Sequence, residues 1–167
     1  TLVSRIWKGT LLFEGTGALL LSIRYIPRFG FLQGIWYSVF HSISAFCNAG
    51  FDLMGITAPY NSLCEFATDP LYIFTMVSLI VIGGIGFFVW DDLLAHKLKF
   101  KKYRLHTKIV LVTTASLLFG GTVLFWIFER NNLMAGYNAF DCFLMSLFSA
   151  VTPRTAGFNS IDTAALT

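Results

Sequence analysis

The sequence has little charge. Only 13% of its 167 residues are Asp, Glu, Lys or Arg, against about a quarter in an ordinary soluble domain. Hydrophobic residues make up 56% of the chain, and the mean hydropathy is +0.69. A soluble fold of this length could not bury so much apolar surface. The composition therefore excludes an ordinary soluble domain and predicts an integral membrane protein.

Cysteine is also scarce, and the common catalytic patterns are missing. The three cysteines are odd in number and form neither a CxxC nor a Cys/His pattern, which argues against a disulfide framework or a zinc site. No nucleophile–base pair stands out. The run Gly83-Gly84-Ile85-Gly86 lies inside a hydrophobic stretch, without the strand–turn–helix context of a nucleotide site. The sequence thus predicts no enzyme, no covalently bound cofactor and no nucleic-acid partner.

Three long apolar runs are present, and each is long enough to cross a bilayer about 30 Å thick. They cover about 6–26, where Pro27 and Gly30 are expected to end the helix, then about 70–90, and then 109–128. Asp69 is placed to cap the second run, with Pro70 in its first turn. Its glycines permit close helix contact or a local kink. These runs predict an all-α membrane fold.

Two shorter apolar segments, about 34–46 and 139–151, have roughly half the length of a span and predict re-entrant half-helices. Each leads into an Ala-Gly-Phe sequence, in a loop over 47–52 and in another over 154–159. The loop sequences are related by an offset of 107 residues and the Ser-Ala pairs before them by 105, while Leu11–Thr16 matches Leu117–Thr122 at an offset of 106. The chain therefore contains two copies of a span, short helix and glycine loop, oriented in parallel.

Such loops suit an ion pathway. Backbone carbonyls at membrane depth need partners that lipid cannot supply. A permeating cation is such a partner, because carbonyl oxygens can bind it in place of its hydration shell. Glycine supplies positive φ and leaves the passage open. Three alternatives remain: ordinary turn glycines, unwound binding segments of a secondary transporter for another small solute, and a membrane scaffold in which the loops only pack helices.

The charges predict an orientation. Six of the twelve basic residues fall within the segment 97–108, whereas 27–70 has only Arg28. Basic loops stay cytoplasmic, so the N-terminus and 91–108 are expected inside, with both glycine loops entering from outside. Arg154 and Glu14 are charges near membrane depth, which are usually paired. We expect Arg154 to brace its loop through Asp162 or Asp141, and Glu14 to have a structural role.

The sequence from Val151 to Asp162 resembles the third pore loop of the Trk/Ktr/HKT potassium transporter superfamily, closest to the bacterial KtrB-type subunit. The sequence from Phe40 to Asp52 resembles the second pore loop. The resemblance covers essentially the whole chain. It implies four K⁺-channel-like units of span, pore helix, re-entrant loop and span around one pore. Residues 1–96 would be the second unit, 97–108 a cytoplasmic loop, and 109–167 part of the third. Because the chain opens at Thr1, we expect an internal fragment.

The resemblance also implies an activity and partners. We expect inward K⁺ transport across the plasma membrane, with Na⁺ as a further ion in some members. The expected backbone ligands are Asn48, Ala49, Gly50, Thr155, Ala156 and Gly157, with Arg154, Glu14 and Asp162 as supports. The expected partners are a second copy of the subunit, a cytosolic nucleotide-binding regulatory ring and membrane lipid. A gate is expected beyond Thr167.

Overall fold

A computed structural model describes residues 2–56, 62–97, 99–161 and 166. Every regular element within these residues is helical, which agrees with the all-α prediction. The six α-helices are α1 (Leu2–Phe29), α2 (Phe31–Phe46), α3 (Pro70–Gly84), α4 (Phe87–His96), α5 (Leu105–Glu129) and α6 (Ala139–Val151). Three short 3₁₀ turns lie between them: η1 (Met54–Ile56), η2 (Cys64–Phe66) and η3 (Phe100–Lys102).

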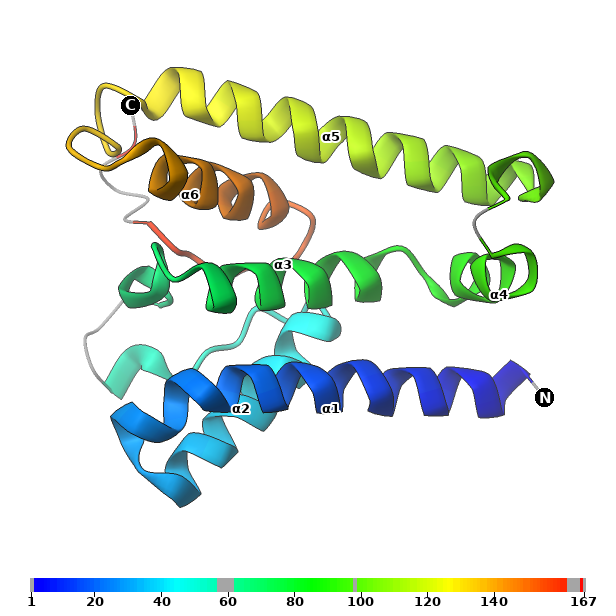
Figure 1. Ribbon diagram of the computed structural model, residues 1–167, viewed down its shortest axis with the longest axis horizontal. Coiled ribbons are helices and arrows are strands. Elements are labelled where there is room, and N and C mark those ends of the chain that lie inside the picture. Colours follow the sequence, from blue (N-terminus) through cyan, green and yellow to red (C-terminus); the bar gives the residue numbers. More distant parts are fainter. Residues whose placement is uncertain (1, 57–61, 98, 162–165, 167) are drawn as a thin grey trace.

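The helices form two pairs with α3 between them (Figure 1). α2 folds back against α1, and α6 folds back against α5. α1 and α5 run in the same direction, whereas α3 runs the opposite way and returns the chain to the side where α1 began. α3 packs on α1 and α2 on one side and on α6 on the other. It is therefore the element that joins the two copies of the helix pair.

The first helix does not end where its proline predicts. α1 continues through Pro27 to Phe29, and α2 begins at Phe31, three residues before the expected Gly34. A proline removes one helical hydrogen bond, to the carbonyl four residues earlier, but the amide of Gly30 still donates to Ile26 O at 3.0 Å. The break comes at Gly30, whose φ of 83° does not fit a right-handed helix. The predicted end at Gly30 is confirmed, whereas the predicted end at Pro27 is wrong.

The apolar run over 70–90 forms two helices with a sharp bend between them. α3 ends at Gly84, α4 begins at Phe87, and the two axes are bent by 95°. Gly86 has a φ of 87°, and the indole nitrogen of Trp90 donates to Ile82 O at 2.9 Å. This bond occupies a carbonyl that the interrupted helix leaves unpaired. The local kink that the glycines were expected to permit is therefore confirmed.

The helices differ in how well they suit a membrane crossing by length and composition alone. Among the described residues, α5 meets the requirement as one straight helix, and α3 with α4 meets it as a bent pair. α1, which we expected as a span, is long enough at 28 residues but carries Glu14 and four basic residues, and it does not meet the same requirement.

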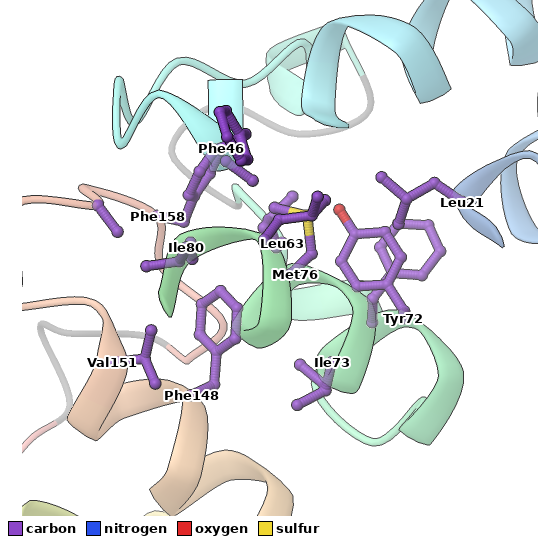
Figure 2. Close-up of a cluster of buried hydrophobic side chains, with 14 of the residues drawn as sticks. Leu21, Phe46, Leu63, Tyr72, Ile73, Met76, Ile80, Phe148, Val151 and Phe158 are labelled. Carbon is purple, nitrogen blue, oxygen red and sulfur yellow. The ribbon is translucent and has the colours of Figure 1, made fainter. Parts of the chain in front are cut away.

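The buried core lies where the two helix pairs meet α3. Its side chains come mainly from α1, α2, α3, α6 and the second glycine loop, and Figure 2 shows several of them packed around α3: Leu21, Phe46, Tyr72, Ile73, Met76, Ile80, Phe148, Val151 and Phe158. Tyr25 of α1 and Tyr72 of α3 share a buried hydroxyl–hydroxyl hydrogen bond of 2.7 Å. The core therefore fixes the position of the second glycine loop relative to α3, through Ala156 and Phe158.

Candidate ion pathway

The two glycine loops, 107 residues apart in sequence, meet backbone to backbone. Gly50 has a φ of 74° and Gly157 a φ of 73°. A β-carbon added to Gly50 would lie 2.7 Å from the carbonyl oxygen of Ala156 and 2.9 Å from the α-carbon of Gly157. A β-carbon on Gly157 would lie 3.1 Å from the α-carbon of Gly50. Glycine is required at both positions by the backbone conformation and by this close approach.

The loops orient their amides toward the helices that precede them. Ala49 N donates to Ser44 O at 2.8 Å, and Ala156 N donates to Thr152 O at 3.1 Å. The six carbonyl oxygens expected to bind cations receive no hydrogen bond from any residue that the structure describes; they belong to Asn48, Ala49, Gly50, Thr155, Ala156 and Gly157. Each loop thus presents unpaired acceptors, as a cation site built on backbone oxygen requires.

A hydroxyl group at the end of each short helix holds the next carbonyl along the loop. Ser44 Oγ donates to Phe51 O at 2.7 Å, and Thr152 Oγ1 donates to Phe158 O at 2.8 Å. We call this pair of bonds the hydroxyl brace. The donor is a serine seven residues before its acceptor in the first copy and a threonine six residues before it in the second. Alignment of the two copies therefore does not predict this pair of bonds. The available signal was a hydroxyl residue at the end of each short apolar segment: Ser44 in the last turn of α2 and Thr152 directly after α6.

A short chain of hydrogen bonds connects the two loops on the side of Asp52. Ser62 Oγ donates to Asp52 Oδ2 at 3.0 Å and accepts from Asn159 N at 3.3 Å. Leu63 N donates to Asn159 O at 2.8 Å. We call these bonds the Ser62 link. The sequence does not predict this link, because nothing in the pattern around Ser62 marks it as a partner of either loop.

The glycines of α3 allow that helix to approach the first loop. A β-carbon on Gly83 would lie 1.9 Å from Phe46 O, and one on Gly84 would lie 3.1 Å from Asn48 Nδ2. The predicted close helix contact is therefore confirmed. The side-chain oxygen Oδ1 of Asn48 is buried and has no hydrogen-bond partner within the described part of the chain.

The internal repeat extends to side-chain hydrogen bonds. Thr16 Oγ1 donates to Leu12 O at 2.9 Å, and Thr122 Oγ1 donates to Leu118 O at 2.7 Å, at the same offset of 106 residues. The glycine that contacts the short helix is Gly17 in the first pair, against Ser42, and Gly121 in the second, against Ala150. The two span–half-helix pairs are thus packed in similar ways.

The two loops differ in how their phenylalanines are placed. Phe158 is fully buried and belongs to the core cluster, whereas 71% of Phe51 is exposed. Phe158 lies beside Ile80 and Phe46 in Figure 2. The second loop is therefore anchored by its own aromatic side chain, and the first is held mainly by hydrogen bonds.

The residues expected to support the loops have mixed placements. Arg154 Nη2 donates to Thr114 Oγ1 of α5 at 3.1 Å, and the ion pairs within the described residues do not join Arg154 to Asp141. The expected brace to Asp141 is wrong because the side chain turns toward α5. Asp162, the other expected partner, lies outside the described residues.

Glu14 contacts the neighbouring half-helix through its backbone. Its carbonyl oxygen accepts from Ser42 Oγ of α2 at 2.7 Å, while its carboxylate lies within electrostatic range of the Cys47 thiol at the start of the first loop. A nearby titratable group, His41, is fully buried. Its Nδ1 lies 2.8 Å from Tyr37 O, and its Nε2 accepts from Leu53 N at 3.4 Å. His41 is therefore a packed, hydrogen-bonded residue.

Side-chain metal ligands are not gathered at the loops. No group of three or more His, Cys, Asp or Glu side chains within the described residues is arranged to hold a metal ion. A cation at this place would therefore depend on the backbone oxygens and on the Asn48 amide.

Comparison with known proteins gives the family. Residues 1–167 match the TrkH family, described as a cation transport protein. The chain is 45% identical over 158 residues to the potassium/sodium uptake protein NtpJ of Enterococcus hirae, covering 94% of this chain and 34% of that protein. It is 43% identical over 164 residues to the Ktr system potassium uptake protein B of Vibrio alginolyticus, covering 96% and 35%. For the Bacillus subtilis protein of the same name the identity is 38% over 163 residues, covering 96% and 35%.

The chain spans about a third of the length of these relatives. The relatives are named as uptake proteins, which agrees with the expectation that no enzyme is present. A match over all 167 residues also supports the predicted membrane protein and the predicted relationship to Trk and Ktr transporters. The chain belongs to the TrkH family of cation transport proteins.

Proposed function

We propose that this chain forms part of the wall of a potassium uptake pore, with Na⁺ as a further ion. Backbone carbonyls of Asn48–Gly50 and Thr155–Gly157 act as the cation ligands. The observation that carries the proposal is that both loops turn their amides toward a preceding helix while six adjacent carbonyls are left without donors among the described residues. The names of the relatives, which include potassium and sodium uptake, support the choice of ion.

The hydroxyl brace separates the loop carbonyls that accept a hydrogen bond from those that are left for the ion. It occupies the carbonyls of Phe51 and Phe158, so these two oxygens are turned toward the ends of α2 and α6. The carbonyls before them are left for the ion. An arrangement of fixed carbonyl dipoles can replace a hydration shell without a large rearrangement when the ion enters.

The larger assembly is also a proposal. The chain supplies the second unit and part of the third in a subunit of four pore units, since it covers about a third of its relatives. The N-terminus and residues 91–108 face the cytoplasm, and both loops enter from outside. The full-length subunit forms a homodimer and associates with a cytosolic nucleotide-binding ring. The name "Ktr system" for two of the relatives supports a system of several components.

A substitution at the meeting point of the loops tests the proposal. Gly157→Ser in the full-length subunit places a side chain 3.1 Å from the α-carbon of Gly50. Rb⁺ and Na⁺ uptake are measured in cells that lack other potassium uptake, with the amount of protein in the membrane determined in parallel. We expect a loss of Rb⁺ uptake or a shift toward Na⁺ at equal protein level.

Gly136→Ser is the matched control. Gly136 also has a positive φ, of 95°, but no described atom lies within 4 Å of its added β-carbon. It therefore carries similar backbone strain outside the loops, and uptake should persist. Unchanged uptake and selectivity in Gly157→Ser would identify Gly157 as a turn residue and remove this loop from the pore.

A further inference from the structure

A separate groove lies at the other end of the molecule, between α1 and the bent α3–α4 pair. Its volume is about 460 Å³. The apolar part of its wall comes from α1 and from both sides of the bend, namely Leu12, Phe13, Ile82, Ile85, Trp90, Leu93 and Leu94. Two cationic residues of α1, Arg5 and Lys8, complete the lining. In Figure 1 this is the end where α4 and the start of α1 lie.

The shape of the groove depends on the 95° bend between α3 and α4. If α3 crosses the membrane, α4 lies close to the membrane plane, where amphipathic helices bind the interface. Trp90 packs beside α1 because Gly9 lacks a side chain: a β-carbon there would lie 2.9 Å from the indole ring. The same indole is held by its bond to Ile82 O. The groove is therefore a built feature with a fixed wall.

The two charged residues that line the groove are both cationic. Arg5 pairs with Asp91 at 2.8 Å. Asp92 is buried and engaged with His96 and the amide of Arg104. The ion pairs within the described residues leave Lys8 without an anionic partner. The following segment adds further exposed cations: Lys97, Lys99, Lys101, Lys102 and Arg104.

We propose that this groove binds an anionic phospholipid. One acyl chain lies along the apolar wall formed by Leu12 and Ile85, and the phosphate group sits at Lys8 beside Arg5. A zwitterionic lipid would bring the same acyl chain but no net negative charge for the cationic rim, so charge selects the anionic headgroup. The occupant is a membrane lipid because apolar walls and a cationic rim meet at the interface of a membrane protein.

Lipid titration of the full-length subunit tests this proposal. The delipidated protein in detergent is titrated with palmitoyl-oleoyl phosphatidylglycerol or with the corresponding phosphatidylcholine, and bound lipids are counted by native mass spectrometry. We expect retained phosphatidylglycerol at a several-fold lower concentration than phosphatidylcholine. Lys8→Gln should remove most of this difference. Lys101→Gln, which changes the same charge outside the groove lining, should leave it in place.

Two neighbouring leucines test the apolar wall. Leu12 and Leu11 are 62% and 61% exposed, but only Leu12 lines the groove. Leu12→Trp should fill the groove and lower phosphatidylglycerol binding, whereas Leu11→Trp should not. Equal binding of the two lipids, or equal effects of the two tryptophans, would overturn the proposal. The proposal would also be overturned if the native protein bound no lipid in the groove and Leu12→Trp destabilised the protein. In that case another part of the polypeptide would occupy the groove. None of these readouts depends on transport.

Discussion

Truncation of Phe158 to alanine is expected to release the second glycine loop. Phe158 is fully buried in the core cluster, next to side chains of α2, α3 and α6. Its carbonyl is also the acceptor of the Thr152 hydroxyl. The substitution leaves this backbone bond chemically possible but removes the packing that holds the residue in place.

The expected cost is large because the surrounding core cannot close completely around an absent ring. Replacing a buried phenylalanine by alanine costs about 3–5 kcal/mol of the free energy of unfolding, which is at least about a hundredfold in the folding equilibrium constant. The corresponding residue of the first loop provides the matched control. Phe51 is 71% exposed, so Phe51→Ala should change the free energy of unfolding by roughly 0.5 kcal/mol or less.

The difference can be measured by reversible unfolding of the full-length subunit in mixed micelles, with helix content followed by circular dichroism. Rb⁺ and Na⁺ uptake should be recorded for the same variants at equal membrane level. We expect Phe158→Ala to be less stable and less selective than Phe51→Ala. If the two variants have free energies of unfolding within about 1 kcal/mol of each other, Phe158 does not anchor the second loop.

Three further substitutions test other parts of the structure. Gly83→Ala should lower the free energy of unfolding by about 3 kcal/mol, the upper end for overpacking, because its β-carbon would lie 1.9 Å from Phe46 O. Gly84→Ala meets only a side-chain amide at 3.1 Å and should cost less. Equal thermal stabilities of the two variants would contradict this packing. Ser62→Ala removes two hydrogen bonds of the Ser62 link and should lower the free energy of unfolding by about 1–2 kcal/mol. Ser22→Ala, which removes an exposed hydrogen bond within α1, is the control and should change it little. Equal stabilities of the two variants would show that the link does not stabilise the fold. The third is Asp92→Asn. The hydroxyl of Thr107, the amide of Arg104 and His96 hold the pKa of Asp92 below its ordinary value of 3.8. The stabilisation from this carboxylate is therefore fully present above pH 3.8 and is lost as the pH falls through the lowered pKa. Asp92→Asn should be less stable than wild type at neutral pH and should lose less stability on acidification; parallel stability curves between pH 6 and pH 3 would count against the role of Asp92.

The sequence predicted those features that depend on local pattern. The short helix before the second loop was expected over 139–151 and the structure has α6 at Ala139–Val151. Asp69 was expected to cap α3, and its side chain accepts from Tyr72 N. Both glycine loops were found from the repeated Ala-Gly-Phe, because positive φ beside a short helix leaves a clear residue signature.

Features that depend on the approach of distant segments were missed. The glycines indicated a possible kink in the run over 70–90, but the sequence did not predict its angle of 95°, which depends on Gly86 and on the hydrogen bond of the Trp90 indole. Pro27 was read as a stop, but near a helix end it removes only one bond. The hydroxyl brace and the Ser62 link rest on single serine and threonine side chains. Such residues are common in loops, and only the folded chain shows which carbonyl each one reaches.

The Ser62 link has a consequence for the order of events during synthesis. Ser62 and Asn159 are 97 residues apart. At a translation rate of about 5–20 residues per second, the first loop waits roughly 5–20 seconds before its partner has been made. During that time the nascent chain in the membrane holds a glycine loop whose contacts with the second loop do not yet exist. Chaperones or the insertion machinery would therefore meet this loop in a less ordered form than the mature transporter contains.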